Sequence, residues 1–214
     1  MQDPRLDRRV QFDERSRAFP IRALLADGLR KPRGFTWSVG QWFDQGKEGQ
    51  CVGFAWAHEM IARPRIWNLT EQSATDIYRK ARTLDEWPGE DYEGTSVIAG
   101  AKACKQLGMI KAYRWAFGLD DLRLALGYKG PAVLGINWYE GMMSPDADGY
   151  IKPTGSLLGG HAILAFSVNE RLKRISLWNS WGATFGHNGT CHVSFYDMEK
   201  LLAEQGEACV PVIR

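Results

Sequence analysis

The chain has 214 residues, of which 44% are apolar and 24% charged, with 27 Lys and Arg against 25 Asp and Glu. This is the composition of a folded globular protein, and it excludes disordered, collagen-like and coiled-coil chains. At this length a full core can form, either in one domain or in two lobes that share an interface. A net charge of +2 gives no general footprint for nucleic acid.

The basic residues are concentrated at the N-terminus. Residues 1–33 carry nine Lys and Arg against five Asp and Glu, whereas the rest of the chain has a net charge of −2. The segment ends in the turn-rich residues 31–34. We predict a basic, irregular arm over residues 1–33. Short apolar groups at 19–21 and 23–25 lead to the hypothesis that this arm packs on the body or covers part of a cleft.

The chain has no segment suited to a bilayer. Its longest apolar runs, 132–136 and 162–166, are far shorter than the roughly 20 residues that a membrane helix needs. The first residues alternate in charge and lack the apolar centre of a secretory signal. The sequence therefore predicts no membrane span and a cytoplasmic location.

The cysteine pattern argues against a disulfide framework or a metal site. The chain has four cysteines, widely separated, and none forms a CxxC pair. Cys104, Cys191 and Cys209 are expected to be small buried apolar residues. No metal or organic cofactor is expected.

Residues 35–128 have the pattern of a helical region. Apolar spacing predicts a helix over 51–62, which Pro64 prevents from continuing, and another over 70–82 with Thr70 as its N-cap. A third helix is predicted from 95 or 96 to 107, closed by Gly108, and a short one over 119–126.

After Gly130-Pro131 the pattern changes to that of strands. Apolar segments suited to strands cover 132–138, 161–168, 174–181 and 190–195. Because helices come first and strands second, the order favours an α+β architecture over an alternating parallel sheet.

Cys51 lies at the predicted start of the first helix. Unpaired backbone N–H groups and the helix dipole favour a thiolate there, so Cys51 is placed to be a nucleophile. Gly46 and Gly49 precede it and allow close approach of a substrate backbone, while Gln45 is placed to complete an oxyanion hole with the Cys51 N–H. For a lone cysteine, a buried structural role is the commoner interpretation.

The second half of the chain supplies partners for a nucleophile. His161 follows two glycines at the head of an apolar strand, and Asn179 lies in the segment Trp178–Gly182, where its amide is placed to orient an imidazole. Either residue alone is equally compatible with a core histidine or a turn asparagine. His58 follows Cys51 by seven residues, beyond direct contact, and is expected at the surface or in the core.

Several motifs in this order resemble those of the papain-like cysteine peptidases. The segment from Gln45 to Cys51, followed by VGFA, resembles the family's glutamine-to-cysteine segment, and Leu69–Gln72 resembles its leucine-serine-glutamate-glutamine helix start. GPAV at 130–133, GHAI at 160–163 and NSWG at 179–182, with Gly186 and Gly189, resemble its later motifs. Together they extend over about residues 40–195.

The resemblance implies a papain-like two-lobed fold. A helical lobe over 34–126 would carry the nucleophile, and an antiparallel, β-barrel-like lobe over 127–214 would carry the histidine and asparagine, with the active cleft between them. It further implies Cys51 as nucleophile, His161 as base and acid, Asn179 as orienter and Gln45 as oxyanion donor. The cleft would also include Gly49, Gly160 and Trp181, of which Trp181 would shield the Asn179–His161 hydrogen bond.

The function that the resemblance implies is a cysteine endopeptidase acting on protein or peptide substrates without a metal or cofactor. Departures from the family pattern are Glu48 at a position that carries a disulfide cysteine in secreted members, Val52 and Phe185 in place of tryptophans, and Gly160 before the histidine. Two alternatives stay open: another thiol amide hydrolase, such as a cell-wall amidase or isopeptidase, and a catalytically quiet structural or assembly protein. The compact form also raises association with virion or assembly proteins.

Overall fold

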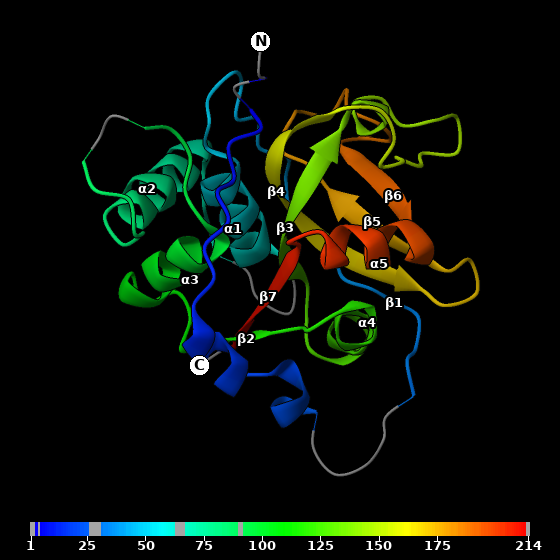
Figure 1. The fold of residues 1–214 in the computed structure, drawn as a ribbon, viewed down its shortest axis with the longest axis horizontal. Helices are drawn as coiled ribbons and strands as arrows, with labels where there is room; N and C mark the ends of the chain where they lie inside the picture. The colour runs from blue at the N-terminus through cyan, green and yellow to red at the C-terminus, as the bar shows by residue number, and fades with distance from the viewer. Residues whose placement is uncertain (1–2, 4, 26–30, 63–66, 90–91, 213–214) are drawn as a thin grey trace.

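The computed structural model describes residues 3, 5–25, 31–62, 67–89 and 92–212. The predicted stop at Pro64 lies outside the described residues. Helices α1, α2 and α3 gather on one side of the molecule and most of the sheet on the other (Figure 1). The N-terminal arm runs along the boundary between them, beside α1 and β4 (Figure 1).

The predicted helices are present with nearly the predicted bounds. They are α1 (Cys51–Ile61), α2 (Glu71–Arg82), α3 (Val97–Gln106) and α4 (Leu119–Tyr128). Thr70 caps α2 by accepting a hydrogen bond from the Ser73 N–H, and Ser96 caps α3 in the same way from Ala99. Every residue of α1 is buried, because α2, α3 and strand β4 pack around it.

The strands form one antiparallel sheet that does not close into a barrel. Its order is β2-β7-β3-β4-β5-β6, with β1 pairing on β4. The strands are β1 (Phe35–Thr36), β2 (Ala112–Trp115), β3 (Ala132–Tyr139), β4 (Leu157–Asn169), β5 (Arg174–Trp178), β6 (Thr190–Ser194) and β7 (Glu207–Val212). All four predicted strands are present, although β5 ends at Trp178 rather than at 181. Strands β1, β2 and β7 and helix α5 (Phe195–Ala203) were not predicted.

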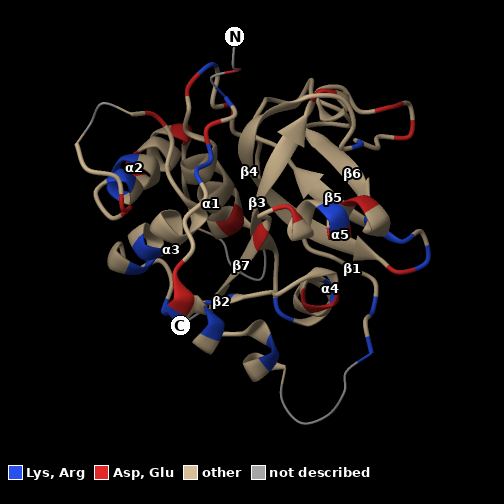
Figure 2. Ribbon diagram, in the orientation of Figure 1, with Lys and Arg blue, Asp and Glu red and all other residues tan. Residues whose placement is uncertain are grey.

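Two apolar clusters form the core. One surrounds α1 and its neighbours α2 and α3, and the other lies between strands β3–β6 and helices α4 and α5. Helix α4 thus packs with the sheet, although it falls within the predicted helical lobe. Charged residues lie mainly in loops and at helix ends, whereas the central strands carry few (Figure 2).

The arm has more structure than the sequence predicted. It contains the short 3-10 helices η1 (Glu14–Ala18) and η2 (Ile21–Leu24). Leu6 and Ile21 are fully buried in the core cluster that also contains α4 and the strands. The arm therefore packs on the body, as the hypothesis drawn from its apolar residues expected.

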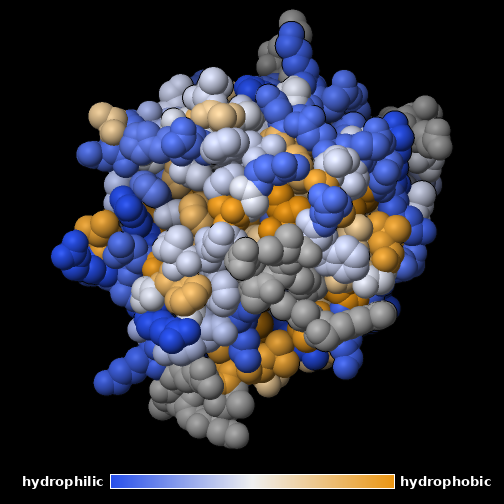
Figure 3. All heavy atoms as spheres, turned by 180° about the vertical axis from the view of Figure 1, so that it is seen from behind, coloured by the Kyte–Doolittle hydropathy of each residue, from blue (hydrophilic) through white to orange (hydrophobic). Residues whose placement is uncertain are grey.

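The surface is mixed in polarity. Seen from behind, hydrophilic side chains cover most of the periphery, and apolar atoms gather near the centre of the face (Figure 3). Among the described residues, no helix combines the length and the apolar character needed to cross a membrane.

Candidate active site

Cys51 is the first residue of α1, as predicted, and its side chain is buried. Hydrogen bonds with the backbones of Ala162 and Asp7 reach its thiol. Ala162 belongs to β4 and follows His161, so the packing of α1 against β4 brings the thiol beside the strand that carries the histidine.

His161 and Asn179 are in direct contact. The distance between His161 Nε2 and Asn179 Oδ1 is 2.8 Å, and both side chains are fully buried. The backbone of Arg5, in the arm, also forms a hydrogen bond with the imidazole. In this form Nε2 is held by the amide and the arm reaches the same ring.

Aromatic rings surround the imidazole. Trp181 lies 5.0 Å from the His161 ring, and Trp138 lies edge-on at 4.8 Å. Sequence reasoning missed Trp138, which ends an apolar strand segment and gives no local signal of a site. The two indoles exclude water from the His161–Asn179 hydrogen bond and so strengthen it.

A glycine-rich turn positions Asn179. The Asn179 N–H donates to the Gly189 carbonyl at 2.9 Å, and Gly182 and Gly189 adopt φ of +73° and +75°. Such angles favour glycine, which has no Cβ to clash. The turn therefore returns the chain toward Asn179 just after β5 ends.

Gln45 is anchored at the same site. Its Oε1 accepts from the Ser180 hydroxyl at 2.6 Å, and its Nε2 donates to the carbonyls of Glu48 at 2.7 Å and of Arg5 at 3.3 Å. The Gln45 amide is thus already engaged by the arm, through the Arg5 carbonyl.

Residues 5–9 of the arm lie across the site. The Arg5 guanidinium stands 4.2 Å from the centre of the Trp181 ring, and the Arg8 N–H donates to the Gly160 carbonyl at 3.0 Å. A Cβ added to Gly49 would come within 2.3 Å of Asp7 Oδ2. Each of the three residues predicted to line the cleft therefore contacts the arm.

Burial of Cys51 and His161 determines their charge states. It raises the pKa of the Cys51 thiol to about 11, against the smaller effect of the backbone hydrogen bonds. Burial also lowers the pKa of His161 to about 4, although the hydrogen bond that Nε2 donates to Asn179 Oδ1 raises it. Both groups are therefore neutral near pH 7, contrary to the thiolate expected from the helix terminus, because desolvation outweighs the dipole.

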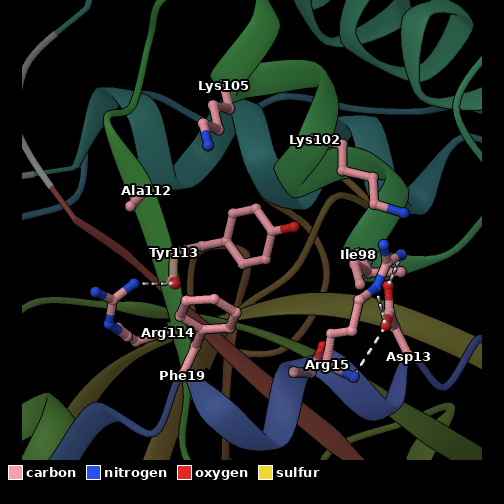
Figure 4. A pocket seen from close by; sticks show the side chains of 10 residues that line it. Asp13, Arg15, Phe19, Ile98, Lys102, Lys105, Ala112, Tyr113 and Arg114 are labelled. Atoms are coloured by element: carbon pink, nitrogen blue, oxygen red, sulfur yellow. Dashed lines mark hydrogen bonds and ion pairs between the residues drawn. The ribbon is translucent and has the colours of Figure 1, made fainter. Parts of the chain in front are cut away.

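The arm is also anchored on the C-terminal side of this crossing. Beyond it, the Trp115 N–H donates to the Phe19 carbonyl at 3.0 Å. A pocket of about 370 Å³ lies where η1, α3 and β2 meet, with Arg15, Lys102 and Arg114 among its lining side chains (Figure 4). Residues 5–9 are therefore followed along the chain by a second docked stretch of the arm.

The remaining titratable candidates have structural roles. His58 is buried, its Nε2 accepts from the Phe43 N–H at 3.1 Å, and burial lowers its pKa to about 3. Cys104, Cys191 and Cys209 are buried, as predicted, and none of the three forms a disulfide. Within the described part of the chain, no group of three or more His, Cys, Asp or Glu is arranged to hold a metal ion.

Comparison with family models gives no match. Among curated proteins, an uncharacterised peptidase C1-like protein of Acanthamoeba polyphaga mimivirus is 25% identical, over 68% of this chain and 61% of its own length. The chain thus spans about three fifths of the curated relative that it matches.

Solved structures resemble the whole fold. Xylellain, a cysteine protease from Xylella fastidiosa, matches with a TM-score of 0.76 at 18% identity, covering 100% of this chain and 97% of its own. A digestive procathepsin L 3 from Tenebrio molitor matches with a TM-score of 0.67 at 15% identity, over 88% of this chain and 73% of its own. Bromelain from Ananas comosus, solved with the E64 inhibitor, matches with 0.56 at 18% identity, over 86% of this chain and all of its own. The chain therefore has the papain-like α+β fold, and the resemblance to papain-like cysteine peptidases seen in its motifs is confirmed.

Proposed function

We propose that this protein is a cysteine endopeptidase in which Cys51 is the nucleophile, His161 the base and acid, Asn179 the orienter and Gln45 an oxyanion donor. The observation that carries the proposal is the hydrogen bond of 2.8 Å between His161 and Asn179, at a strand that packs against the N-terminus of the helix bearing Cys51. The fold of known cysteine proteases supports it.

The chemistry requires a proton acceptor and a stabilised oxyanion. His161 Nδ1 takes the thiol proton, and the sulfur attacks the peptide carbonyl carbon, forming the C–S bond while the carbonyl oxygen becomes negative. Hydrogen bonds from Gln45 Nε2 and the Cys51 N–H stabilise that charge. His161 then gives its proton to the leaving amine as the C–N bond breaks.

Water completes the cycle. His161 takes a proton from water, whose oxygen attacks the thioester carbonyl, and the C–S bond breaks as the thiol regains its proton. Asn179 holds the ring through Nε2 during both transfers, which keeps Nδ1 directed at the reacting atoms. No step needs a metal or an organic cofactor.

In this proposal, the form in which the arm covers the site is inactive. Residues 5–9 fill the space a substrate needs, and the burial they contribute keeps both Cys51 and His161 neutral. Displacement of these residues would rehydrate the pair, lower the thiol pKa and raise that of the imidazole. Activity therefore depends on how often this part of the arm leaves the site.

Covalent trapping by E64, the inhibitor bound in the bromelain structure, tests the proposal directly. We expect prolonged incubation of the full chain with E64 to modify Cys51 alone, and cleavage of unfolded protein to disappear in Cys51→Ala with the circular dichroism unchanged. Cys104→Ala is the matched control. Parallel assays with peptidoglycan fragments and isopeptides would reveal another thiol amide hydrolase. Modification without hydrolysis of any amide would contradict the proposal and favour a structural role.

A further inference from the structure

A positively charged pocket lies where the second docked stretch of the arm meets the body. It has a volume of about 370 Å³ and is formed by η1, α3 and β2. Its lining includes four cationic side chains, Arg15, Lys102, Lys105 and Arg114, and one carboxylate, Asp13. Four positive charges and one negative charge give the lining a net charge of +3. We call this space the basic pocket.

The carboxylate is already paired within the arm. Asp13 accepts hydrogen bonds from Arg15 Nε at 2.8 Å and from Arg15 Nη2 at 2.7 Å, so it neutralises the cation that the arm contributes. Among the described residues, Lys102, Lys105 and Arg114 form no ion pair. The three cations of the body therefore line the pocket without a counter-ion.

The fold holds these cations close together. Lys102 and Lys105 lie three residues apart and therefore on one face of α3. In Figure 4 the two lysine side chains reach down from α3 on either side of the Tyr113 ring, and Arg15 and Arg114 flank the same space. Like charges gathered in this way repel one another, and an anion between them removes that cost.

The rest of the pocket suits a small molecule. Its volume of about 370 Å³ lies near the lower end of the range of roughly 300–1,000 Å³ that is typical of small-ligand sites. Phe19, Ile98 and Tyr113 provide apolar walls, and the hydroxyl of the buried Ser16 adds a hydrogen-bond donor. The size and the charge together fit a compact anion with several charged oxygens.

We propose that the basic pocket binds a small anion that carries at least two phosphate or carboxylate groups, and that this ligand holds η1 on the body. Lysine and arginine bind such oxygens through charge-assisted hydrogen bonds. Arg15 and Ser16 belong to the arm, whereas the other cations belong to α3 and β2. The site is thus complete only while the arm is docked. The inference does not rest on the proposed function, because no candidate catalytic residue lines this pocket.

Ligand binding and docking of the arm are therefore coupled. A ligand that binds only when η1 is docked lowers the fraction of molecules with η1 undocked by a factor of 1 + [L]/Kd. At ten times Kd this factor is about eleven. The Trp115 N–H reports on the docking, because it donates to the Phe19 carbonyl of the arm at 3.0 Å.

Isothermal titration calorimetry of the full chain measures binding, with pyrophosphate and citrate as the two probes. We expect saturable binding of at least one probe, with one site per chain and an affinity that falls as the salt concentration rises. Tighter binding of pyrophosphate would identify a phosphate ligand, and tighter binding of citrate a carboxylate ligand. Binding of neither probe would overturn the proposal.

Variants locate the site. Lys102→Gln and Arg114→Gln should each weaken binding by about tenfold or more, because a hydrogen bond between charged groups contributes that factor. Lys111→Gln is the matched control, because Lys111 is exposed, directly precedes β2 and does not line the pocket. Circular dichroism confirms that each variant is folded. Equal weakening by all three substitutions would indicate diffuse attraction to the surface and would overturn the site.

Hydrogen exchange tests whether the ligand holds the arm. At ten times Kd the Trp115 N–H should exchange about tenfold more slowly than without ligand. The Ile151 N–H, which donates to the His192 carbonyl at 2.9 Å and not to the arm, should be unchanged. Binding without slower exchange at Trp115 would overturn the coupling. Neither readout involves hydrolysis, so both results hold even if the chain cleaves no peptide.

Discussion

Replacing Arg8 by alanine should uncover Cys51. The fully buried Arg8 side chain donates three hydrogen bonds, two to the Glu207 carboxylate and one to the Gln205 carbonyl. The substitution removes all three from the covered form. In the open form the same groups are solvated, so their loss there costs little.

The size of the expected change follows from the charged groups that form these hydrogen bonds. A hydrogen bond to a charged group contributes roughly 1.5–3 kcal/mol, and the three share one guanidinium and are not additive. A net loss of about 2–3 kcal/mol from the covered form would raise the open fraction roughly 30- to 150-fold.

Thiol chemistry adds to this effect. A pKa of about 11 leaves roughly one Cys51 thiol in 3,000 ionised at pH 7.5, whereas the ordinary value of about 8.5 leaves roughly one in ten. Reaction with iodoacetamide therefore proceeds almost entirely through the open form, and its rate measures the open fraction.

The assay is alkylation with limiting iodoacetamide at pH 7.5, followed by peptide mapping. We expect Cys51 in Arg8→Ala to react at least about tenfold faster than in the parent, while Cys191, buried in the sheet core, stays unreactive. Arg15→Ala is the control, because Arg15 is largely exposed and its ion pair is with Asp13 on the same arm. Equal rates for parent and Arg8→Ala would refute the conclusion that this ion pair holds the arm over the site.

Three further predictions test separate parts of the site. Burial, and to a smaller extent the negative charge of Glu93, raises the pKa of Asp7 to about 6 in the covered form. Above that pH the ionised carboxylate opposes docking of the arm, so Asp7→Asn should slow alkylation of Cys51 at pH 7.5. The difference in rate from the parent should shrink as the pH falls from 6.5 toward 4.5. Gly160→Ala would place a Cβ 2.2 Å from the Arg8 carbonyl oxygen and should speed alkylation, whereas Gly130→Ala, with open space at its Cβ, should not. In the Arg8→Ala background, Asn179→Ala should lower kcat by roughly tenfold or more with little change in KM, because in the proposed mechanism the amide orients the imidazole rather than binding substrate.

Local patterns in the sequence predict most of the fold. Apolar spacing and the caps Thr70 and Ser96 define the helices, because these signals lie within a few residues of the elements they delimit. Strand β7 was missed because Pro211 interrupts its apolar run. Helix α5 was missed because Phe195 continues the strand pattern of β6, so the Ser194 cap was not recognised.

The candidate site, like the fold, was predicted only in part. Cys51, His161, Asn179 and Gln45 lie in ordered motifs, so the sequence places them together, and their roles stay predictions. The sequence led to the hypothesis that the arm covers part of a cleft, but the contacts that hold it over Cys51 could not be predicted, because Arg8 and Glu207 are 199 residues apart. The pKa directions followed from that covering: a helix N-terminus favours a thiolate only where water or a charged partner also reaches it.

The most direct test of the central claim is hydrolysis of a labelled, unfolded protein by the Arg8→Ala chain, compared with the same chain carrying Cys51→Ala as well. If Cys51 is the nucleophile of a peptidase that residues 5–9 cover, Arg8→Ala should cleave faster than the parent and the double variant should not cleave. Equal cleavage by both variants, or rapid alkylation of Cys51 in Arg8→Ala without any cleavage, would contradict it.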